Sequence, residues 1–127
     1  MDEKLMKHGA FSWFELMTSD VQSAKEFYSK LLGWTTQEMP MQDSTYTVVE
    51  VDGEAVGGIM SLPSSPEGMP PVWGIYITVK NIDDTVKTAV ELGGKIFVEP
   101  QNIPDVGRFS VIQDPQGAYF AVMEYKQ

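Results

Sequence analysis

The chain contains 127 residues, of which 43% are hydrophobic and 21% are charged, so its composition is typical of a globular protein and not of a disordered or fibrous one. A chain of this length is most simply one domain that buries a core of its own. Eighteen acidic residues against nine basic ones give a formal net charge of -9, which argues against nucleic acid and anionic membrane surfaces as partners, because such a field repels phosphate groups.

The sequence contains no cysteine, which excludes disulfides, thiol catalysis and thiolate metal sites. Residues 1–9 show no periodic pattern, and we expect them to form a loose lead-in. They lack the continuous apolar core of a secretory signal, and the chain has no apolar run of about 18 residues. We therefore expect a cytoplasmic protein without a membrane partner.

The first half of the chain predicts a strand followed by an amphipathic helix. Residues 10–17 are rich in aromatic and apolar side chains, which indicates a strand that is largely buried on both faces. Ser19 or Asp20 is expected to cap the following helix, and Gly33 to end it. Apolar residues recur at helical spacing between these ends and are expected to pack on a sheet, Phe27 and Tyr28 among them.

Further strands complete the first half. Residues 34–51 predict two strands, and Asp52-Gly53 is a hairpin signal that returns the chain into another strand over residues 54–62. Gly57 and Gly58 interrupt this last strand. They either bulge it or let a ligand approach its backbone.

A proline-rich segment, residues 63–71, separates the two halves. Its four prolines cannot continue a central strand or a helix, so it is expected to be a linker. The linker either folds one half onto the other within the chain or lets halves exchange between chains. Beyond it, the sequence predicts a strand over 72–79, a helix over 82–92 capped by Asn81, a short strand over 95–99, a loop holding Pro100 and Pro104, a strand over 108–113, a turn over 114–117 and a strand over 118–125.

The second half repeats the plan of the first. Sliding the sequence by about 61 residues places Phe14 on Ile75, and Asp20 on Asn81. Both halves then read as β-α-β-β-β, which predicts the α+β class. We expect a single domain over residues 1–127, made of modules at about 10–62 and 72–125.

Several short motifs occur in a fixed order along this frame. T-x-D precedes a helix that ends F-Y-x-x-L-L-G-W, and W-x-x-Y-I-x-V, I-P-x-x-G-R and D-P-x-G-A-x-F follow. The ordered set resembles the glyoxalase, bleomycin-resistance and dioxygenase group, also called the vicinal oxygen chelate superfamily, which includes lactoylglutathione lyase. The resemblance implies two βαβββ modules that form curved mixed sheets around a cleft.

The resemblance also indicates which positions would hold a metal ion. Metal-using members hold a divalent ion through side chains of the first and last strands of each module. The matching positions here are Trp13, Gly58, Gly74 and Ala121, and none of them ligates such an ion through its side chain. We therefore expect neither metal nor cofactor, and we expect His8 to be solvated. Oxygen-only ligation of a divalent cation stays open as an alternative, through Glu15, Glu50 and Glu124.

Glu15 is the candidate catalytic residue. It shares strand parity with Trp13, so it faces a cavity if Phe14 and Leu16 pack on the helix. Burial in an apolar pocket favours the neutral carboxyl, which suits a general acid or base. Alternatively, Glu15 is structural and pairs with Arg108 or with a backbone amide.

Aromatic side chains on the predicted strands indicate a cleft for a flat or amphipathic small molecule. Arg108 is the cation expected near it, where it either binds a ligand carboxylate or pairs with Glu50 or Glu99. The residues expected to bind the ligand are Trp13, Tyr46, Gly58, Trp73, Tyr76, Arg108, Phe109 and Ala121.

Two classes of function follow from these residues. The first is a metal-independent module that binds a small organic ligand. The second is a lyase or isomerase related to lactoylglutathione lyase that uses Glu15 or an unusual metal site. The resemblance also implies a homodimer, and the apolar strand edges favour pairing.

Overall fold

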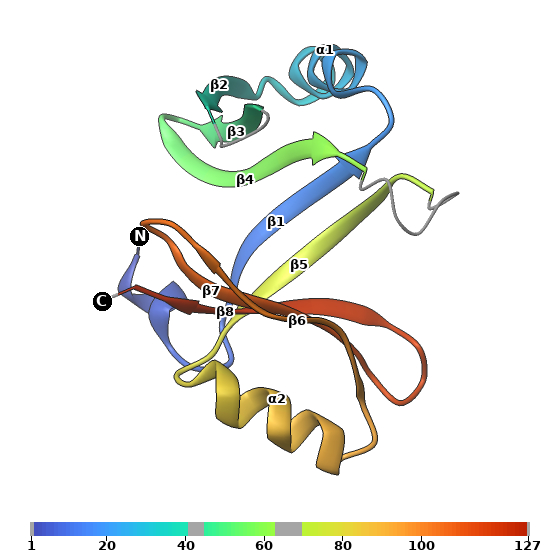
Figure 1. Cartoon of the computed structure of the whole chain (residues 1–127). Helices are drawn as coiled ribbons and strands as arrows, with labels where there is room; N and C mark the ends of the chain where they lie inside the picture. The colour runs from blue at the N-terminus through green and yellow to red at the C-terminus, as the bar shows by residue number, and fades with distance from the viewer. Residues whose placement is uncertain (1, 41–44, 63–69, 127) are drawn as a thin grey trace. The chain divides into compact units, whose positions relative to one another are not determined.

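The computed structural model describes residues 2–40, 45–62 and 70–126 and carries the βαβββ order twice (Figure 1). The α+β class and the two modules are therefore confirmed. The first series is β1 (Phe11–Thr18), α1 (Val21–Leu32), β2 (Thr35–Pro40), β3 (Thr45–Val51) and β4 (Glu54–Ser61). The second is β5 (Val72–Thr78), α2 (Ile82–Glu91), β6 (Lys95–Ile103), β7 (Gly107–Gln113) and β8 (Tyr119–Tyr125).

The chain divides into two compact units. The first unit is Trp13–Gly74, and the second unit combines Met1–Ser12 with Ile75–Gln127. Neighbouring strands follow the order β2-β3-β4-β1 in the first series and β5-β8-β7-β6 in the second. The pairs β1–β4 and β5–β8 are parallel and the other pairs are antiparallel, so both series form mixed sheets.

Side-chain caps explain where both helices begin. The Asp20 carboxylate accepts a hydrogen bond from the Ser23 N–H at 3.0 Å, and the Asn81 side chain accepts one from the Asp84 N–H at 3.0 Å. Each satisfies an amide that has no partner within its helix. Gly33 ends α1 with φ of 76°, a left-handed conformation that favours glycine. The predicted capping residues are confirmed.

Each helix covers one face of the sheet in its own unit. In the first unit, Leu16, Val49 and Ile59 are buried, and α1 and the residues beside it pack on them. In the second unit the buried cluster consists of Val79, Ile82, Ile112 and Val122. Because side chains alternate along a strand, residues of the other parity lie on the face opposite the helix.

The N-terminal segment differs from the expected loose lead-in. Residues Glu3–Met6 form a 3-10 helix, η1, which Asp2 caps. Thr78 fastens the segment to the rest of the second unit: its O–H donates to the Leu5 carbonyl, and its carbonyl accepts from the Gly9 N–H at 2.8 Å. These contacts depend on a residue about seventy positions away, which is why the local sequence carries no sign of them.

Two other expectations need correction, and a third falls outside the described residues. The loop expected at Pro100 is part of β6, whose register is irregular between Val98 and Gln101. Proline is tolerated there because β6 lies at the end of the strand order, where no second neighbour needs its amide. Phe27 is 59% exposed, although Tyr28 packs on the core as expected. Most of the predicted linker, residues 63–69, lies outside the described chain.

None of the helices in the described residues is long and apolar enough to cross a membrane.

The buried cluster under α1 should dominate the stability of the first unit. Ile59 is 0% exposed and packs with Leu16 and Val49, so Ile59→Ala should lower the free energy of unfolding by about 2–5 kcal/mol. Val51 is 43% exposed, and Val51→Ala should change the free energy of unfolding by about 0.5 kcal/mol or less. Urea unfolding of both variants measures the difference. Equal losses would contradict this assignment of the core.

Candidate functional site

Three polar side chains of the first unit form a hydrogen-bonded chain on the face opposite α1. Leu16 packs toward α1, so Trp13 and Glu15 lie on the opposite face of β1. The Trp13 Nε1–H donates to Tyr46 Oη at 2.9 Å. The Tyr46 O–H in turn donates to Glu15 Oε1 at 2.7 Å. The structure thus brings together the candidate catalytic residue and two predicted ligand-binding residues.

Gly58 makes the room that this chain of hydrogen bonds needs. Gly58 lies beside Glu15 in the β1–β4 pairing and beside Val48 in the β3–β4 pairing. A Cβ atom at Gly58 would lie 1.8 Å from Tyr46 Oη and 2.1 Å from its Cζ. The phenol of Tyr46 therefore occupies the space that a side chain at position 58 would fill.

The direction of each hydrogen bond follows from chemistry. An indole N–H only donates, so the Tyr46 oxygen must accept from Trp13 and give its own proton to Glu15. Glu15 is only 9% exposed, and a hydrogen bond to a carboxylate in such a place is stronger than one between neutral groups. The arrangement holds the carboxylate in one orientation beside an aromatic ring.

The β4 bulge lies next to Gly57. Val49 pairs with Gly57, and Glu50 pairs with Ala55, so β4 has one extra residue at this point. Gly57 is itself constrained, since a Cβ there would lie 2.4 Å from the Phe14 carbonyl oxygen. Of the two interpretations of the glycine pair, the bulge is present.

The second unit places other predicted ligand-binding residues on the face opposite α2. Ile112 and Val122 pack toward α2, so Phe109 and Ala121 have the opposite parity. Tyr76 pairs with Ala121 across β5 and β8, and its carbonyl accepts from the Ser12 hydroxyl at 3.4 Å.

Ser12 also contacts a tyrosine of the second unit. The hydroxyls of Ser12 and Tyr125 lie 2.8 Å apart. Burial raises the pKa of the Tyr125 phenol, and the hydrogen bond with Ser12 opposes that shift. Tyr125 therefore stays protonated at neutral pH.

Trp73 lies in an aromatic cluster with α1. Its Nε1–H donates to Tyr28 Oη at 3.1 Å, and its ring centroid lies 5.4 Å from that of Tyr28 and 5.9 Å from that of Trp34. The prediction grouped Trp73 with the rings expected to face the ligand. The structure packs it against Tyr28 of α1 and against Trp34, and Trp73 is 41% exposed.

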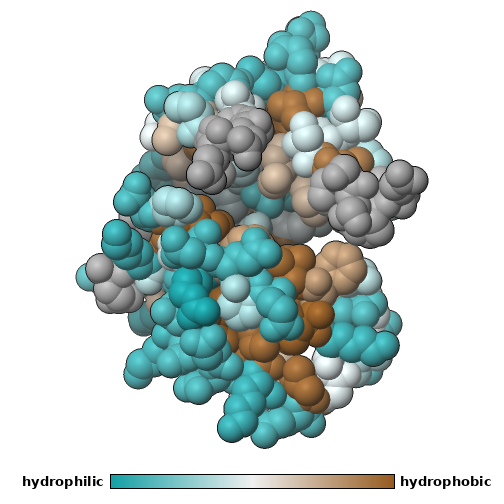
Figure 2. Space-filling view, in the orientation of Figure 1, coloured by the Kyte–Doolittle hydropathy of each residue, from teal (hydrophilic) through white to brown (hydrophobic). Residues whose placement is uncertain are grey.

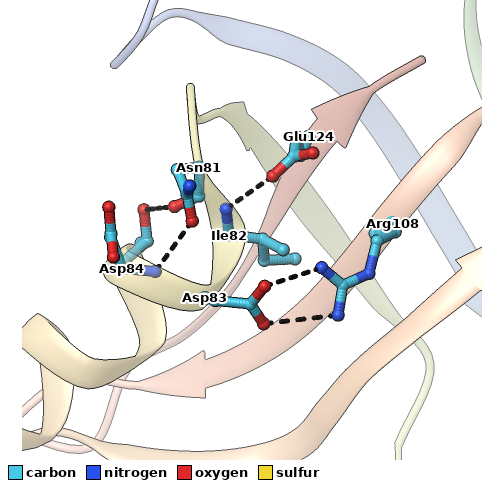
Figure 3. Close-up of polar contacts among 7 residues, drawn as sticks. Asn81, Ile82, Asp83, Asp84, Arg108 and Glu124 are labelled. Carbon is cyan, nitrogen blue, oxygen red and sulfur yellow. Dashed lines mark hydrogen bonds and ion pairs between the residues drawn. The ribbon is translucent and has the colours of Figure 1, made fainter.

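Arg108 also lies on the helix side of its sheet (Figure 3). Its guanidinium binds the Asp83 carboxylate with both terminal nitrogens, at 3.0 and 3.3 Å. This hydrogen-bonded cation holds the pKa of the Asp83 carboxyl below its usual range. The structural partners proposed from the sequence, Glu50 and Glu99, are both wrong, and so is a pairing of Arg108 with Glu15.

The residues at the family's metal positions do not fit a divalent cation. Position 13 presents an indole N–H donor, and the space at position 58 holds the Tyr46 phenol. Gly74 and Ala121 offer no side-chain donor atoms. Within the described residues, no three His, Asp or Glu side chains gather as a set that could hold a metal ion.

The other candidate ligands have partners elsewhere. Glu124 Oε1 accepts a hydrogen bond from the Ile82 N–H at 2.8 Å, at the start of α2 (Figure 3). His8 is exposed as expected, but its Nδ1 accepts from the Lys80 N–H at 3.0 Å. The proposed oxygen-only site of Glu15, Glu50 and Glu124 is therefore not formed in the described chain.

The contact between Gly58 and Tyr46 gives a test of the site. In Gly58→Ala the new methyl group displaces the phenol and breaks its hydrogen bonds with Trp13 and Glu15. We expect a loss of about 1–3 kcal/mol in the free energy of unfolding and a changed tryptophan fluorescence spectrum.

Gly74→Ala is the matched control. The nearest atom to its new methyl group is the Glu15 carbonyl oxygen at 3.8 Å, an ordinary contact, so both measurements should stay near those of the wild type. An unchanged spectrum in Gly58→Ala would show that the phenol does not lie over Gly58.

Known proteins share both the sequence pattern and the fold. The model of the Glyoxalase/Bleomycin resistance protein/Dioxygenase superfamily matches residues 10–122. The provisionally named glyoxylase CFP32 of Mycobacterium tuberculosis is 39% identical over 115 residues, which are 88% of this chain and 44% of that protein. Anthracycline biosynthesis protein DnrV of Streptomyces peucetius is 32% identical over 127 residues, covering 90% of this chain and 46% of that one. The chain thus spans about half the length of these relatives.

Solved structures agree on the fold. Methylmalonyl-CoA epimerase from Mycobacterium tuberculosis superposes with a TM-score of 0.67 at 17% identity, covering 100% of this chain and 93% of that one. Hypothetical protein BH1468 from Bacillus halodurans C-125 gives 0.70 at 16% identity, covering 95% of this chain and 97% of that one. The family model matches most of the chain, and the chain belongs to the Glyoxalase/Bleomycin resistance protein/Dioxygenase superfamily.

Proposed function

We propose that the chain binds a small organic molecule at the cluster of Trp13, Tyr46 and Glu15, without a divalent metal. The observation that carries this proposal is the Tyr46 phenol, which lies over Gly58 and donates to Glu15. Positions 13 and 58, where a metal-using relative would carry metal-binding side chains, here belong to a cluster of hydrogen-bonded side chains. Its chemistry suits recognition of an organic polar group.

The residues of this cluster suggest the kind of ligand. The indole of Trp13 gives a flat apolar contact, and the nearby Glu15 carboxylate attracts a hydrogen-bond donor such as an amine or a hydroxyl. Binding sites for small molecules commonly combine apolar walls with a few placed polar groups. The name of one relative refers to anthracycline biosynthesis, which supports a flat ligand of this kind.

The alternative is a lyase or isomerase in which Glu15 is the base. A carboxylate that is 9% exposed and oriented by Tyr46 is in a suitable place to take a proton from a bound substrate. Binding and catalysis use the same residue in these two proposals, so one substitution tests both. The homodimer and the cytoplasmic location stay predictions.

Metal content separates the proposal from the metal-dependent chemistry of other family members. After incubation with nickel, zinc, manganese and iron and then dialysis, elemental analysis should find much less than one metal ion per chain. The physical reason is that the four candidate positions offer a ring N–H, two hydrogens and a methyl group. One ion retained per chain would overturn the metal-free proposal.

The Glu15→Gln variant tests the carboxylate, because an amide can still accept the Tyr46 hydrogen bond but carries no charge. The probe is the anthracycline daunorubicin, whose flat ring system carries an amino sugar. We expect fluorescence titration to show affinity reduced about 10- to 100-fold, as for a lost hydrogen bond to a charged group. The stability of the variant should remain close to that of the wild type.

Glu54→Gln is the control, since Glu54 is an exposed carboxylate of the same unit. It should bind the probe as the wild type does. A Glu15→Gln variant that loses stability but keeps its affinity would make the carboxylate structural. Turnover of the methylglyoxal–glutathione hemithioacetal by the wild type, lost in Glu15→Gln, would favour the enzyme instead.

A further inference from the structure

A groove of about 870 Å³ runs along α2 in the second unit, apart from the residues of the proposed function. One side of α2 forms one wall, and residues of β7, β8 and the turn between them form the other. Hydrophobic surface is visible among hydrophilic side chains around α2 (Figure 2). The volume falls within the range of small-molecule pockets, about 300–1,000 Å³. Its lining includes Thr85, Thr88, Ala89, Gly94, Pro115 and Phe120.

The internal repeat explains why this groove exists. Asp20 and Asn81 cap the two helices, so positions counted from them correspond. Counting the same distance from each cap reaches Tyr28 in α1 and Ala89 in α2. A phenol in the first unit thus corresponds to a methyl group in the second, and Ala89 lines the groove.

A second ring is missing at the end of the helix. Each helix is followed by a glycine with positive φ, Gly33 and Gly93, and the second unit reaches this glycine one residue sooner after its cap. The next residue is Trp34 in the first unit and Gly94 in the second, where it lines the groove. In the first unit the rings of Tyr28 and Trp34 stack with centroids 5.4 Å apart and an interplanar angle of 19°. Trp73 packs against both of them edge-on. The first unit therefore has aromatic rings at two positions whose counterparts in the second unit, Ala89 and Gly94, line the groove.

The aromatic cluster of Tyr28, Trp34 and Trp73 also contains polar groups, and these have a counterpart in the groove. There the Trp73 N–H donates to the Tyr28 hydroxyl at 3.1 Å, so the rings are held by a hydrogen bond in addition to their stacking. In the groove, the side chain of Thr88 offers a hydroxyl from the wall formed by α2. Lys80 lines the groove together with Asp84 and Asp114, so charges of both signs are present and an uncharged ligand suits it best.

We propose that the groove along α2 is a second ligand site, which takes an uncharged flat aromatic ring of indole size with an N–H or O–H donor. The bound ring occupies the volume that Tyr28 and Trp34 fill in the first unit. The apolar groups of Ala89, Pro115 and Phe120 contact it. The inference rests on the internal repeat and stands whether or not the first unit binds a ligand.

Indole is the probe, and the full chain labelled with ¹⁵N is the sample. In amide correlation spectra, indole should shift the signals of Thr88, Ala89 and Gly94 in a saturable manner. Ala89→Tyr restores the ring of the first unit and should abolish these shifts. Lys87→Tyr places the same ring at an exposed position of the same helix and should leave them unchanged.

A second variant keeps the proposal testable if Ala89→Tyr does not fold. Thr88 is exposed and corresponds to Phe27 in α1, so Thr88→Phe should fold and should reduce the affinity for indole at least several-fold. Glu15→Gln should keep the α2 shifts, since Glu15 belongs to the other unit. The proposal is overturned if indole gives no saturable shift along α2, or if the shifts persist in a folded Ala89→Tyr variant.

Discussion

Burial of one sheet face under a helix is the constraint on which the rest of each unit depends. In the first unit, Leu16 and Ile59 must face α1 to leave water, and that requirement fixes the parity of β1 and β4. Trp13, Glu15 and Gly58 then fall on the opposite face. A register slip of one residue would place the Glu15 carboxylate in the apolar core, so the same free energy that stabilises the core also positions the candidate site.

The candidate site on this opposite face depends on a glycine in one strand and a tyrosine in the neighbouring strand. Gly58 contributes no side chain, and the Tyr46 phenol occupies the space from a neighbouring strand. The phenol oxygen then accepts from Trp13 and donates to Glu15, so the buried carboxylate has a hydrogen-bond donor in Tyr46. Because a buried charge without such a donor is costly, Tyr46 and Glu15 are expected to depend on each other.

The parts that could be predicted from the sequence are those set by local patterns. Capping by Asp20, the stop at Gly33 and the shared parity of Trp13 and Glu15 each follow from a few neighbouring residues. The position of the Tyr46 phenol could not be predicted in this way, because it depends on the pairing of β3 with β4 and on a space left by a distant glycine. The ion pair of Arg108 with Asp83 and the docking of η1 on Thr78 likewise join segments that lie far apart in the chain.

The two units show how a repeated fold can carry different sites. Both keep a capped helix on a mixed sheet, since that burial stabilises each of them. Their side chains differ where the fold does not require a particular residue: the first unit has three packed rings beside its helix, and the second has a methyl group and a glycine hydrogen at two of the corresponding positions. An empty groove lacks the dispersion contacts and the burial of apolar surface that side chains filling it would provide. A ligand that fills the groove along α2 would recover part of that stabilisation, which is the physical basis for binding there.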